Sequence, residues 1–227
     1  SDQGYQGVVI STEKLDHCQV EGNQIRAEAG VKLARMAKQA LEHGLAGLEF
    51  AAGIPGTVGG ALVMNAGAYG SEMKNVLVDA VLLTKDGAVI RRTGEELELG
   101  YRTSNIPIEG LTVLEAEVRL QLGDKTEILR VMNDLAAKRR EKQPLEYPSA
   151  GSTFKRPEGY FAGKLIDDAG LRGFQVGGAQ VSEKHCGFVI NRNQATAADV
   201  EELCRQVAEK VKEQSGVDLE MEIKRLG

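Results

Sequence analysis

The sequence predicts a mixed α+β fold rather than a doubly wound parallel sheet. Helix-like and strand-like segments follow one another irregularly along the 227 residues, and two strand-like runs are joined by Asp86-Gly87. That dipeptide tolerates the positive φ angles of a tight antiparallel hairpin. Pro144 and Pro148 follow a helix-like stretch and indicate a boundary between two lobes. Antiparallel hairpins beside separate helices are typical of the α+β class.

The first lobe is expected to alternate strands with two helices. Strands are predicted over 7–10 and 22–30, within 76–93 on both sides of the hairpin, and over 111–122, where apolar and polar residues alternate. Helices are predicted over 31–43, which stops at Gly44, and over 126–140, where the apolar spacing changes to the helical period.

The second lobe is expected to hold two helices and two strands. The predicted elements are a helix over 161–169 that stops at Gly170, a strand over 187–190, a helix that ends at Gly216, and a strand over 218–226. The long helix is the best defined of these, because Thr196 and Asp199 have the spacing of a capping box.

Composition excludes several classes of protein. A net charge of −5 and a pI near 5.4 argue against general binding to nucleic acid or anionic membranes. Cys18, Cys186 and Cys204 are odd in number and lack the spacing of a zinc site, so we interpret them as reduced thiols of a cytoplasmic protein. No secretory signal pattern and no metal site is predicted, and the sequence does not indicate an oligomeric state.

Residues 51–70, AAGIPGTVGGALVMNAGAYG, form the most unusual segment. It has six glycines, one proline and no charge. Glycine lets a flat or anionic ligand lie directly on main-chain N–H groups, so we interpret the segment as a cofactor cradle. A tight turn between two buried elements is the alternative. A transmembrane helix is excluded, because Pro55 and the glycines interrupt the apolar span that it would need.

Four further segments carry polar residues that could do chemistry. In YRTSN at 101–105, we expect Arg102 and Ser104 to share one extended face, and the arginine offers a planar fork for a carboxylate or phosphate; a surface ion pair is the alternative. In AGSTFKRP at 150–157, Ser152 follows Gly151 in a turn but lacks the elbow of a serine hydrolase, which leaves a proton donor, an anion ligand or a serine bonded to its own turn.

The other two segments lie closer to the C-terminus. Lys184 and His185 precede an apolar strand, where a lone histidine is usually structural. Glu220 and Glu222 alternate onto one side of the last predicted strand. A glutamate that faces a dry pocket would be a candidate acid, whereas a solvated edge strand is the alternative.

Taken in order, GIPGTVGGALVMNAGAYG, YRTSN, AGSTFKRP, AGKLIDDAGLRGFQVGGAQVSEKHCGFVIN and the terminal LEMEIKRLG resemble the UDP-N-acetylenolpyruvoylglucosamine reductases. The resemblance covers essentially the whole chain. Within the family, the chain is similar to the shorter of the two architectural types. It implies an FAD-binding type 2 fold, like that of vanillyl-alcohol oxidase, with a small α+β substrate-binding domain. It also implies that NADPH reduces FAD, which then reduces the enolpyruvyl ether to UDP-N-acetylmuramate for peptidoglycan synthesis.

The same resemblance assigns roles to residues by motif position. Arg102 would hold the substrate carboxylate and the developing charge, Ser152 would protonate C2, and Glu222 would help to stabilise the intermediate. Lys155, Lys184 and His185 would contact the UDP-sugar. The flavin contacts that the resemblance implies are Gly53, Ile54, Gly56, Thr57, Gly59, Gly60, Asn65 and Gly67.

The resemblance also predicts the domain organisation. We expect an FAD-binding domain over 1–143, a substrate-binding domain over 144–215, and a strand over 216–227 that returns to the flavin side. Because the similarity starts at SDQGYQG, we expect the chain to lack the family's small N-terminal lobe, which carries a second FAD-binding loop. Two alternatives stay open: a non-catalytic sugar-nucleotide-binding fragment, and an oxidase of small alcohols or sugars with the same fold.

Overall fold

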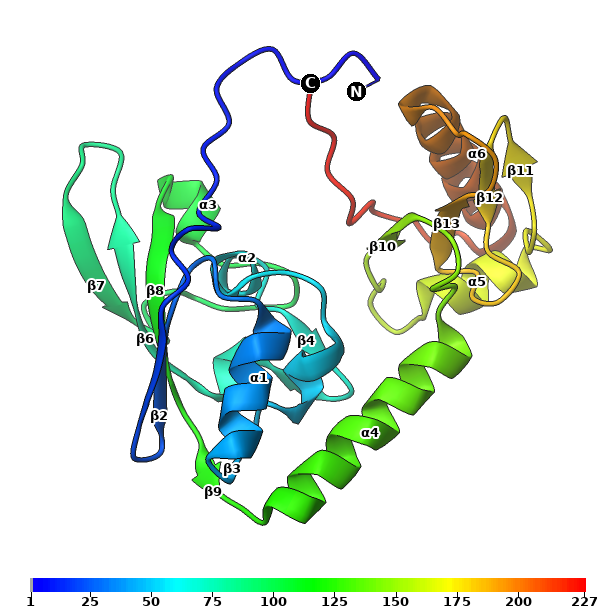
Figure 1. The fold of residues 1–227 in the computed structure, drawn as a ribbon. Helices are drawn as coiled ribbons and strands as arrows, with labels where there is room; N and C mark the ends of the chain where they lie inside the picture. Colours follow the sequence, from blue (N-terminus) through cyan, green and yellow to red (C-terminus); the bar gives the residue numbers. More distant parts are fainter. Residues whose placement is uncertain (1) are drawn as a thin grey trace. The chain divides into compact units, whose positions relative to one another are not determined.

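The computed structural model describes residues 2–227 and divides them into two compact units (Figure 1). The sheet unit comprises Val9–Arg139, and the C-terminal unit comprises residues 2–8 with Arg140–Gly227. Each unit has its own hydrophobic core. The division falls inside helix α4 (Lys125–Lys142), close to the predicted boundary at residue 143, while the functional assignment of the domains stays a prediction.

The sheet unit is built on a five-stranded antiparallel sheet. Its order is β1-β2-β8-β6-β7, with bounds Cys18–Glu21, Gln24–Glu28, Thr112–Arg119, Leu77–Leu83 and Val89–Thr93. A row of alanines, Ala27, Ala116 and Ala80, crosses the three central strands and is buried. The neighbouring row carries charge, because Arg26 pairs with Glu117 at 2.6 Å. This alternation is the period of two that half-buried strands require.

Helices α1 (Leu33–Glu42) and α2 (Val58–Val63) pack against this sheet. Helix α1 buries Leu33, Met36, Ala37 and Ala40. It ends before Gly44, which has a φ of +66° and therefore a left-handed conformation that suits glycine. The predicted helix, its stop and the Asp86-Gly87 hairpin between β6 and β7 are all confirmed.

Short elements complete the sheet unit. They are β3 (Leu45–Ala46), η1 (Glu49–Gly53), β4 (Gly67–Ala68), β5 (Ser71–Glu72), η2 (Met73–Asn75), α3 (Ile106–Glu109) and β9 (Gln121–Leu122). No helix within residues 2–227 is both long and apolar enough to cross a membrane.

The C-terminal unit packs helices against a four-stranded antiparallel sheet. The sheet order is β10-β13-β12-β11, with bounds Ser149–Ser152, Phe188–Asn191, Ala179–Val181 and Gln175–Val176. The helices are α5 (Ala162–Asp168) and α6 (Ala197–Ser215). The predicted capping box is confirmed, because the Thr196 side chain accepts from the Asp199 N–H and the Asp199 side chain accepts from the Thr196 N–H. Gly216 ends α6 in a left-handed conformation.

Two predicted strands are wrong. Gly7 lies in a bend and residues 8–10 form no strand, and Val8, Val9 and Ile10 are 87%, 76% and 86% exposed. A β-branched run favours a strand only where a partner supplies hydrogen bonds. Residues 218–226 form a single bridge, between Met221 and Phe154, rather than a continuous strand.

Candidate active site

The glycine-rich segment runs through η1, an extended stretch, α2 and the turn into β4. Its glycines serve two different purposes. A Cβ on Gly56 or Gly60 would meet almost no neighbouring atom, and both residues are exposed, so a ligand can approach their backbone. A Cβ on Gly59 would lie 3.0 Å from the Ala29 Cβ, and one on Gly67 would lie 2.7 Å from the Ser71 carbonyl oxygen. Gly59 and Gly67 are therefore required by the packing of the chain itself.

The backbone at the start of α2 is largely used within the fold. The Val58 N–H donates to the Val31 carbonyl and the Gly59 N–H to the Ala29 carbonyl, both at 2.9 Å. These two donors hold α2 against the end of β2 rather than being available to an anion. Ile54 and Thr57 lie in the half-exposed approach to the helix. The predicted flavin contacts of the segment stay a prediction, with the open backbone at Gly56 and Gly60 as the part that fits best.

A cation lies beside this segment within the same unit. The side chain of Arg139, on α4, has its Cδ 3.5 Å and its Nη1 3.7 Å from the position that a Cβ on Gly53 would occupy. Gly53 thus leaves room for a guanidinium, which is the donor best matched to a phosphate or a carboxylate. No local pattern predicted this neighbour, since Arg139 is one member of a basic cluster at the end of a long helix.

Asn65 is fully buried and joins three parts of the sheet unit. Its Nδ2 donates to the Gly100 carbonyl at 3.0 Å, and its Oδ1 accepts from the Lys74 N–H at 2.9 Å. The carboxamide is therefore turned into the protein. Any contact of Asn65 with a cofactor would have to use its backbone.

Arg102 lies in a tight turn, not on an extended face. The Gly100 N–H donates to the Thr103 carbonyl at 3.1 Å, and Arg102 has a φ of +54°. The expected shared face with Ser104 is wrong for this reason: Ser104 is buried and its Oγ donates to the Val63 carbonyl at 2.8 Å, while the Arg102 Nη2 donates to the Gly67 carbonyl at 3.3 Å. Both side chains nevertheless return to the glycine-rich segment.

In the C-terminal unit, Ser152 ends strand β10 at a bulge. Ser149 pairs with Ile190 and Ser152 with Phe188, so the β10 strand holds one extra residue between the two pairs. Gly151 has a φ of +91° and makes this irregularity. Ser152 is an exposed residue, which is compatible with each of its three predicted roles.

Thr153 joins Ser152 to the two other candidate segments of this unit. Its N–H donates to the Gly187 carbonyl at 2.9 Å, its carbonyl accepts from the Glu222 N–H at 2.9 Å, and its Oγ1 accepts from the Val189 N–H at 2.8 Å. Thr153 is itself buried. The structure thus brings Ser152, Glu222 and the loop before β13 together through a single threonine, which sequence reasoning missed.

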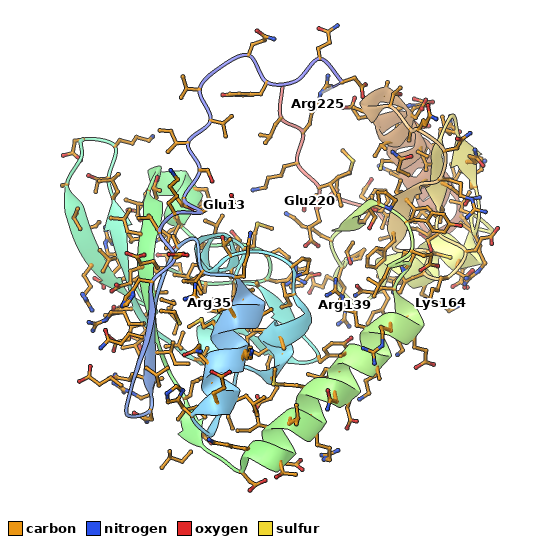
Figure 2. The ribbon with its side chains drawn as sticks, viewed as in Figure 1. Glu13, Arg35, Arg139, Lys164, Glu220 and Arg225 are labelled. Carbon is orange, nitrogen blue, oxygen red and sulfur yellow. The ribbon has the colours of Figure 1, made fainter. Side chains whose placement is uncertain are left out.

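Lys155 and Glu220 form the next pair along the same short ladder. The Lys155 N–H donates to the Glu220 carbonyl at 2.8 Å, and the Lys155 ammonium lies 2.5 Å from the Glu220 carboxylate. Figure 2 labels Glu220. Glu220 is largely exposed and its charge is balanced by this lysine. The assignment of the catalytic acid to Glu222, which the motif resemblance implies, stays a prediction.

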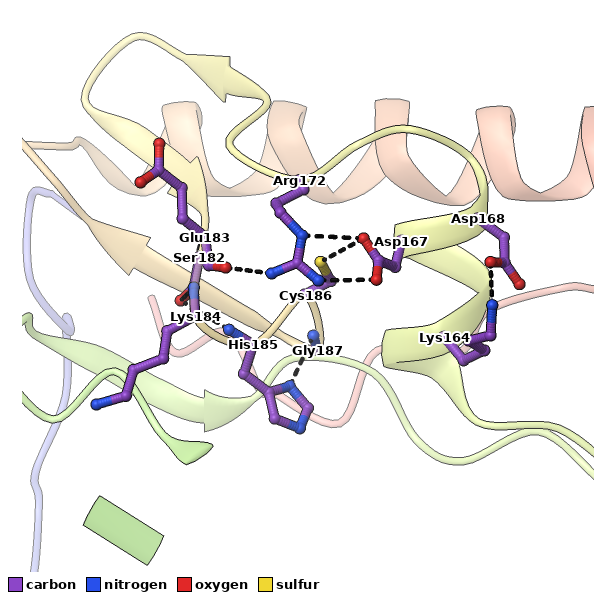
Figure 3. A network of polar contacts seen from close by, with 10 residues as sticks. All are labelled: Lys164, Asp167, Asp168, Arg172, Ser182, Glu183, Lys184, His185, Cys186 and Gly187. Atoms are coloured by element: carbon purple, nitrogen blue, oxygen red, sulfur yellow. Dashed lines mark hydrogen bonds and ion pairs between the residues drawn. The ribbon is translucent and has the colours of Figure 1, made fainter. Parts of the chain in front are cut away.

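The loop of residues 182–187 carries Lys184 and His185 (Figure 3). Buried Ser182 shapes it, because its Oγ accepts from both the Lys184 and the His185 N–H at 3.2 Å. The His185 Nδ1 accepts from the Gly187 N–H at 3.0 Å, so the neutral ring carries its proton on Nε2. Burial lowers the pKa of His185 and keeps the ring neutral. The Lys184 ammonium donates to the Arg140 carbonyl at 2.8 Å.

An ion pair holds this loop against helix α5. The Arg172 guanidinium donates through Nε and Nη2 to the two carboxylate oxygens of Asp167, at 3.0 and 2.7 Å, and through Nη1 to the Glu183 carbonyl (Figure 3). This fork lowers the pKa of Asp167. The buried Cys186 thiol lies 3.6 Å from the same carboxylate, and burial raises its pKa, so the thiol stays protonated and unreactive.

The described residues offer neither a metal-binding cluster nor a disulfide. Among residues 2–227, no group of three histidine, cysteine or acidic side chains is arranged to hold a metal ion. Burial also raises the pKa of Cys204, to about 11, and of Cys18. The three cysteines are free thiols, as the sequence suggests.

Comparison with known proteins first gives the class of protein. Residues 1–93 match the family model of an FAD binding domain, and residues 143–226 match that of the UDP-N-acetylenolpyruvoylglucosamine reductase C-terminal domain. An FAD-binding domain with antiparallel sheets and an arginine turn beside its glycine-rich segment defines an FAD-dependent oxidoreductase.

Relatives then give the family. The chain is 60% identical to UDP-N-acetylenolpyruvoylglucosamine reductase of Agathobacter rectalis and 52% identical to that of Exiguobacterium sibiricum, with all of this chain and 76% and 74% of those proteins covered. It also resembles the crystal structure of the Thermus caldophilus enzyme, at 37% identity and a TM-score of 0.82 over 94% of this chain and 76% of that one. The chain belongs to the UDP-N-acetylenolpyruvoylglucosamine reductase family.

Proposed function

We propose that this protein reduces UDP-N-acetylglucosamine enolpyruvate to UDP-N-acetylmuramate, with FAD as its cofactor and NADPH as the reductant. The observation that carries the proposal is the attachment of the Arg102 turn to the glycine-rich segment, through Asn65 to Gly100 and Arg102 to Gly67. A flavoenzyme that reduces an anionic substrate needs a fixed cation near its cofactor segment. The names of its relatives supply the substrate class.

The residues present fit an FAD. Gly56 and Gly60 leave open backbone on the segment that the family assigns to the flavin, and Arg139 brings a cation to Gly53. When bound, FAD supplies the hydride that it has received from NADPH. The remaining roles belong to side chains of this chain, each acting on the sugar nucleotide.

Arg102 is the proposed electrostatic catalyst. Reduction of the enolpyruvyl double bond leaves negative charge spread over C2 and the carboxylate, and a guanidinium stabilises both oxygens of that carboxylate at once. Because Arg102 occupies a turn rather than a flexible strand end, its position is fixed before the charge develops. Such preorganisation is what makes electrostatic stabilisation effective.

Ser152 and Glu222 are the proposed partners for the proton that C2 receives. Ser152 has an exposed hydroxyl at a bulge, and Glu222 is held to the adjacent Thr153 by its backbone N–H. The hydroxyl donates to C2, and the glutamate stabilises the intermediate. Proton transfer from a hydroxyl to a carbanion-like carbon is downhill, so a serine suffices as the acid.

Lys155, Lys184 and His185 are proposed contacts for the anionic UDP-sugar. His185 enters as a neutral Nε2–H donor, since its Nδ1 is occupied by the Gly187 N–H. Lys155 and Lys184 already hold protein partners, Glu220 and the Arg140 carbonyl, which they would share with the ligand. We further propose that this reaction takes place in the cytoplasm, where sugar nucleotides are made.

The test measures the two half-reactions separately. The purified protein, reconstituted with FAD, should bleach its flavin absorbance on addition of NADPH and recover it only when the enolpyruvyl sugar nucleotide is added. A colourless protein that binds the sugar nucleotide would favour the non-catalytic alternative. Oxygen uptake with a simple alcohol, without the enolpyruvyl reaction, would favour the oxidase.

A further inference from the structure

We propose that Asn65 is a positioning residue that couples the glycine-rich segment to the Arg102 turn. The role of Arg102 rests on the proposed function, whereas the coupling itself rests on the geometry of the sheet unit. Asn65 was expected to contact the flavin, but its side chain is fully buried and both of its polar atoms bind backbone.

The backbone of Asn65 ends helix α2. Asn65 has a φ of +42°, its N–H donates to the Leu62 carbonyl at 3.2 Å, and the following Ala66 N–H donates to the Ala61 carbonyl at 2.8 Å. These are the two hydrogen bonds of a Schellman motif, with Asn65 as its left-handed residue. Glycine is the usual residue at that position, because it has no Cβ to strain. Helix termination alone therefore gives no reason for an asparagine here.

The side chain supplies the reason. A carboxamide is both a donor and an acceptor, and Asn65 uses both functions on main-chain groups of distant segments. The Lys74 N–H identifies the Oδ1 end, and the Gly100 carbonyl identifies the Nδ2 end. Without the carboxamide, the Lys74 N–H would lose this acceptor, and the Gly100 carbonyl would keep only its 3.4 Å bond from the Thr103 N–H.

Gly100 is the first residue of the Arg102 turn. Its N–H and carbonyl pair with Thr103 across the turn, and the carbonyl also receives the Asn65 Nδ2. Two further bonds attach the turn to the same segment, from Ser104 to the Val63 carbonyl and from Arg102 to the Gly67 carbonyl. Val63, Asn65 and Gly67 lie at or just beyond the end of α2, so three hydrogen bonds attach the arginine turn to the helix end.

The decisive variant is Asn65→Gly. It keeps, and even eases, the left-handed backbone that ends α2 while removing only the carboxamide. We expect the variant to bind FAD and to be reduced by NADPH as the parent is, because the removed atoms do not face a ligand. We expect kcat for the enolpyruvyl substrate to fall roughly 10- to 100-fold, the scale of a catalytic group displaced by about 1 Å.

Glu98→Gly is the matched control. Glu98 lies in the same unit, has a φ of +49° and has an exposed side chain, so this change also replaces a left-handed residue by glycine. It should leave both half-reactions unchanged. Asn65→Asp is a second test variant. It retains the acceptor for the Lys74 N–H but places a carboxylate oxygen against the Gly100 carbonyl. We expect it to lower kcat at least as much as Asn65→Gly does.

Two measurements separate positioning from general structural damage. In an Arg102→Lys background, Asn65→Gly should have little further effect on kcat, since both changes act through the same guanidinium. Amide hydrogen exchange at Gly100 and Thr103 should accelerate in Asn65→Gly and not in Glu98→Gly. Equal fold-losses in both backgrounds, an unchanged exchange rate, or a loss of FAD affinity with normal kcat would overturn the proposal.

Failure of the proposed function would look different. If the parent protein did not oxidise NADPH in response to the enolpyruvyl substrate, the assignment of the reaction would fall. The exchange measurement on the Arg102 turn needs no substrate and would still decide whether Asn65 couples it to the end of α2.

Discussion

Individual side chains of the C-terminal unit divide clearly between holding the fold and facing solvent. Thr153 is buried and all three of its polar groups are bonded, whereas the hydroxyl of the preceding Ser152 is exposed. The bulge at Gly151 separates the two, because it inserts one extra residue into β10. The exposed Ser152, rather than Thr153, is therefore the proposed proton donor.

Ser152→Ala should leave reduction of the flavin by NADPH intact and lower turnover of the enolpyruvyl substrate by roughly 100-fold or more, because a general acid typically contributes 10²–10⁴-fold. Stopped-flow absorbance measures the two half-reactions separately. Ser149→Ala, on the same strand and also exposed, is the control. Equal losses in both half-reactions would contradict the assignment of Ser152 as the proton donor.

His185 makes stability depend on pH. Burial lowers its pKa in the folded protein below the ordinary value near 6.5, so the unfolded chain takes up a proton at a higher pH than the folded one does. The stability contributed by the neutral ring is therefore present above about pH 6.5 and is lost as the pH falls through the folded pKa.

Denaturant unfolding at pH 7.5 and pH 5.5 tests this dependence. The parent should lose more stability than His185→Gln between these values, because glutamine does not titrate. His17→Gln, an exposed histidine in the sheet unit, should behave as the parent does. A parent and a His185→Gln variant with the same pH dependence would show that burial does not perturb this ring.

At the scale of elements, helix α6 shows how much local sequence can determine. Thr196 and Asp199 cap each other at its start, and the Asp2 carboxylate also accepts from the Ala197 N–H at 2.8 Å. Arg205 adds pairs with Glu202 and Glu209 on the exposed face. Hydrogen bonds from Arg205 and Gln206 hold the pKa of Glu202 at about 2.

Thr196→Ala should destabilise the protein by about 1 kcal/mol, the usual cost of a lost N-cap. The midpoint of chemical unfolding, followed by far-UV circular dichroism, measures it. Thr126→Ala is the control, because Thr126 lies exposed in the first turn of α4, where Asp124 already caps the helix. A loss for Thr126→Ala as large as that for Thr196→Ala would mean that capping is not the cause.

The elements that could be predicted share a local cause. The Asp86-Gly87 hairpin, the glycine that ends α1 and the cap of α6 each depend on residues adjacent in sequence, and all three are confirmed. The predictions that were wrong concern segments whose structure depends on residues distant in sequence. Residues 8–10 have strand-forming side chains but no described strand beside them, and the bonds that attach the Arg102 turn run to residues far along the chain.

The candidate site residues also divide into those that a local motif predicts and those that depend on distant partners. Motifs identified the glycine-rich segment and its arginine, because those residue types are unusual in a core. Nothing local marked Thr153, Arg172 or the bridging role of Asn65, since a threonine, an arginine and an asparagine at those positions are ordinary in sequence. The register of β10 with β13, and of residues 153–155 with 220–222, reveals what Thr153 holds together. Side-chain hydrogen bonds to distant segments reveal the roles of Arg172 and Asn65.

At the scale of the whole molecule, each of the two units has a separate core. Leu82 is fully buried in the sheet unit and Leu203 in the C-terminal unit, and they belong to different clusters. Helix α4, which spans the division, buries Ile128, and its half-buried Met132 packs against the first core. The two cores should therefore respond separately to damage.

Leu82→Ala and Leu203→Ala test this separation as a matched pair. Each should destabilise its own unit by about 2–5 kcal/mol, the range for buried leucine truncations. Hydrogen exchange resolved along the chain should show faster exchange in residues 9–139 for the first variant and in residues 140–227 for the second. Loss of protection throughout the chain in either variant would indicate one cooperative unit instead.

The extended run of Val8, Val9 and Ile10 has a consequence for colloidal behaviour. Three exposed β-branched residues in an unpaired backbone can add to a sheet edge of another copy, and a net charge of −5 is what keeps copies apart at low salt. Light scattering of a concentrated solution should therefore rise as salt screens that charge. Val9→Lys should suppress the rise, whereas Val89→Lys, on the exposed edge strand β7, should suppress it less. Storage at low ionic strength would then limit such association.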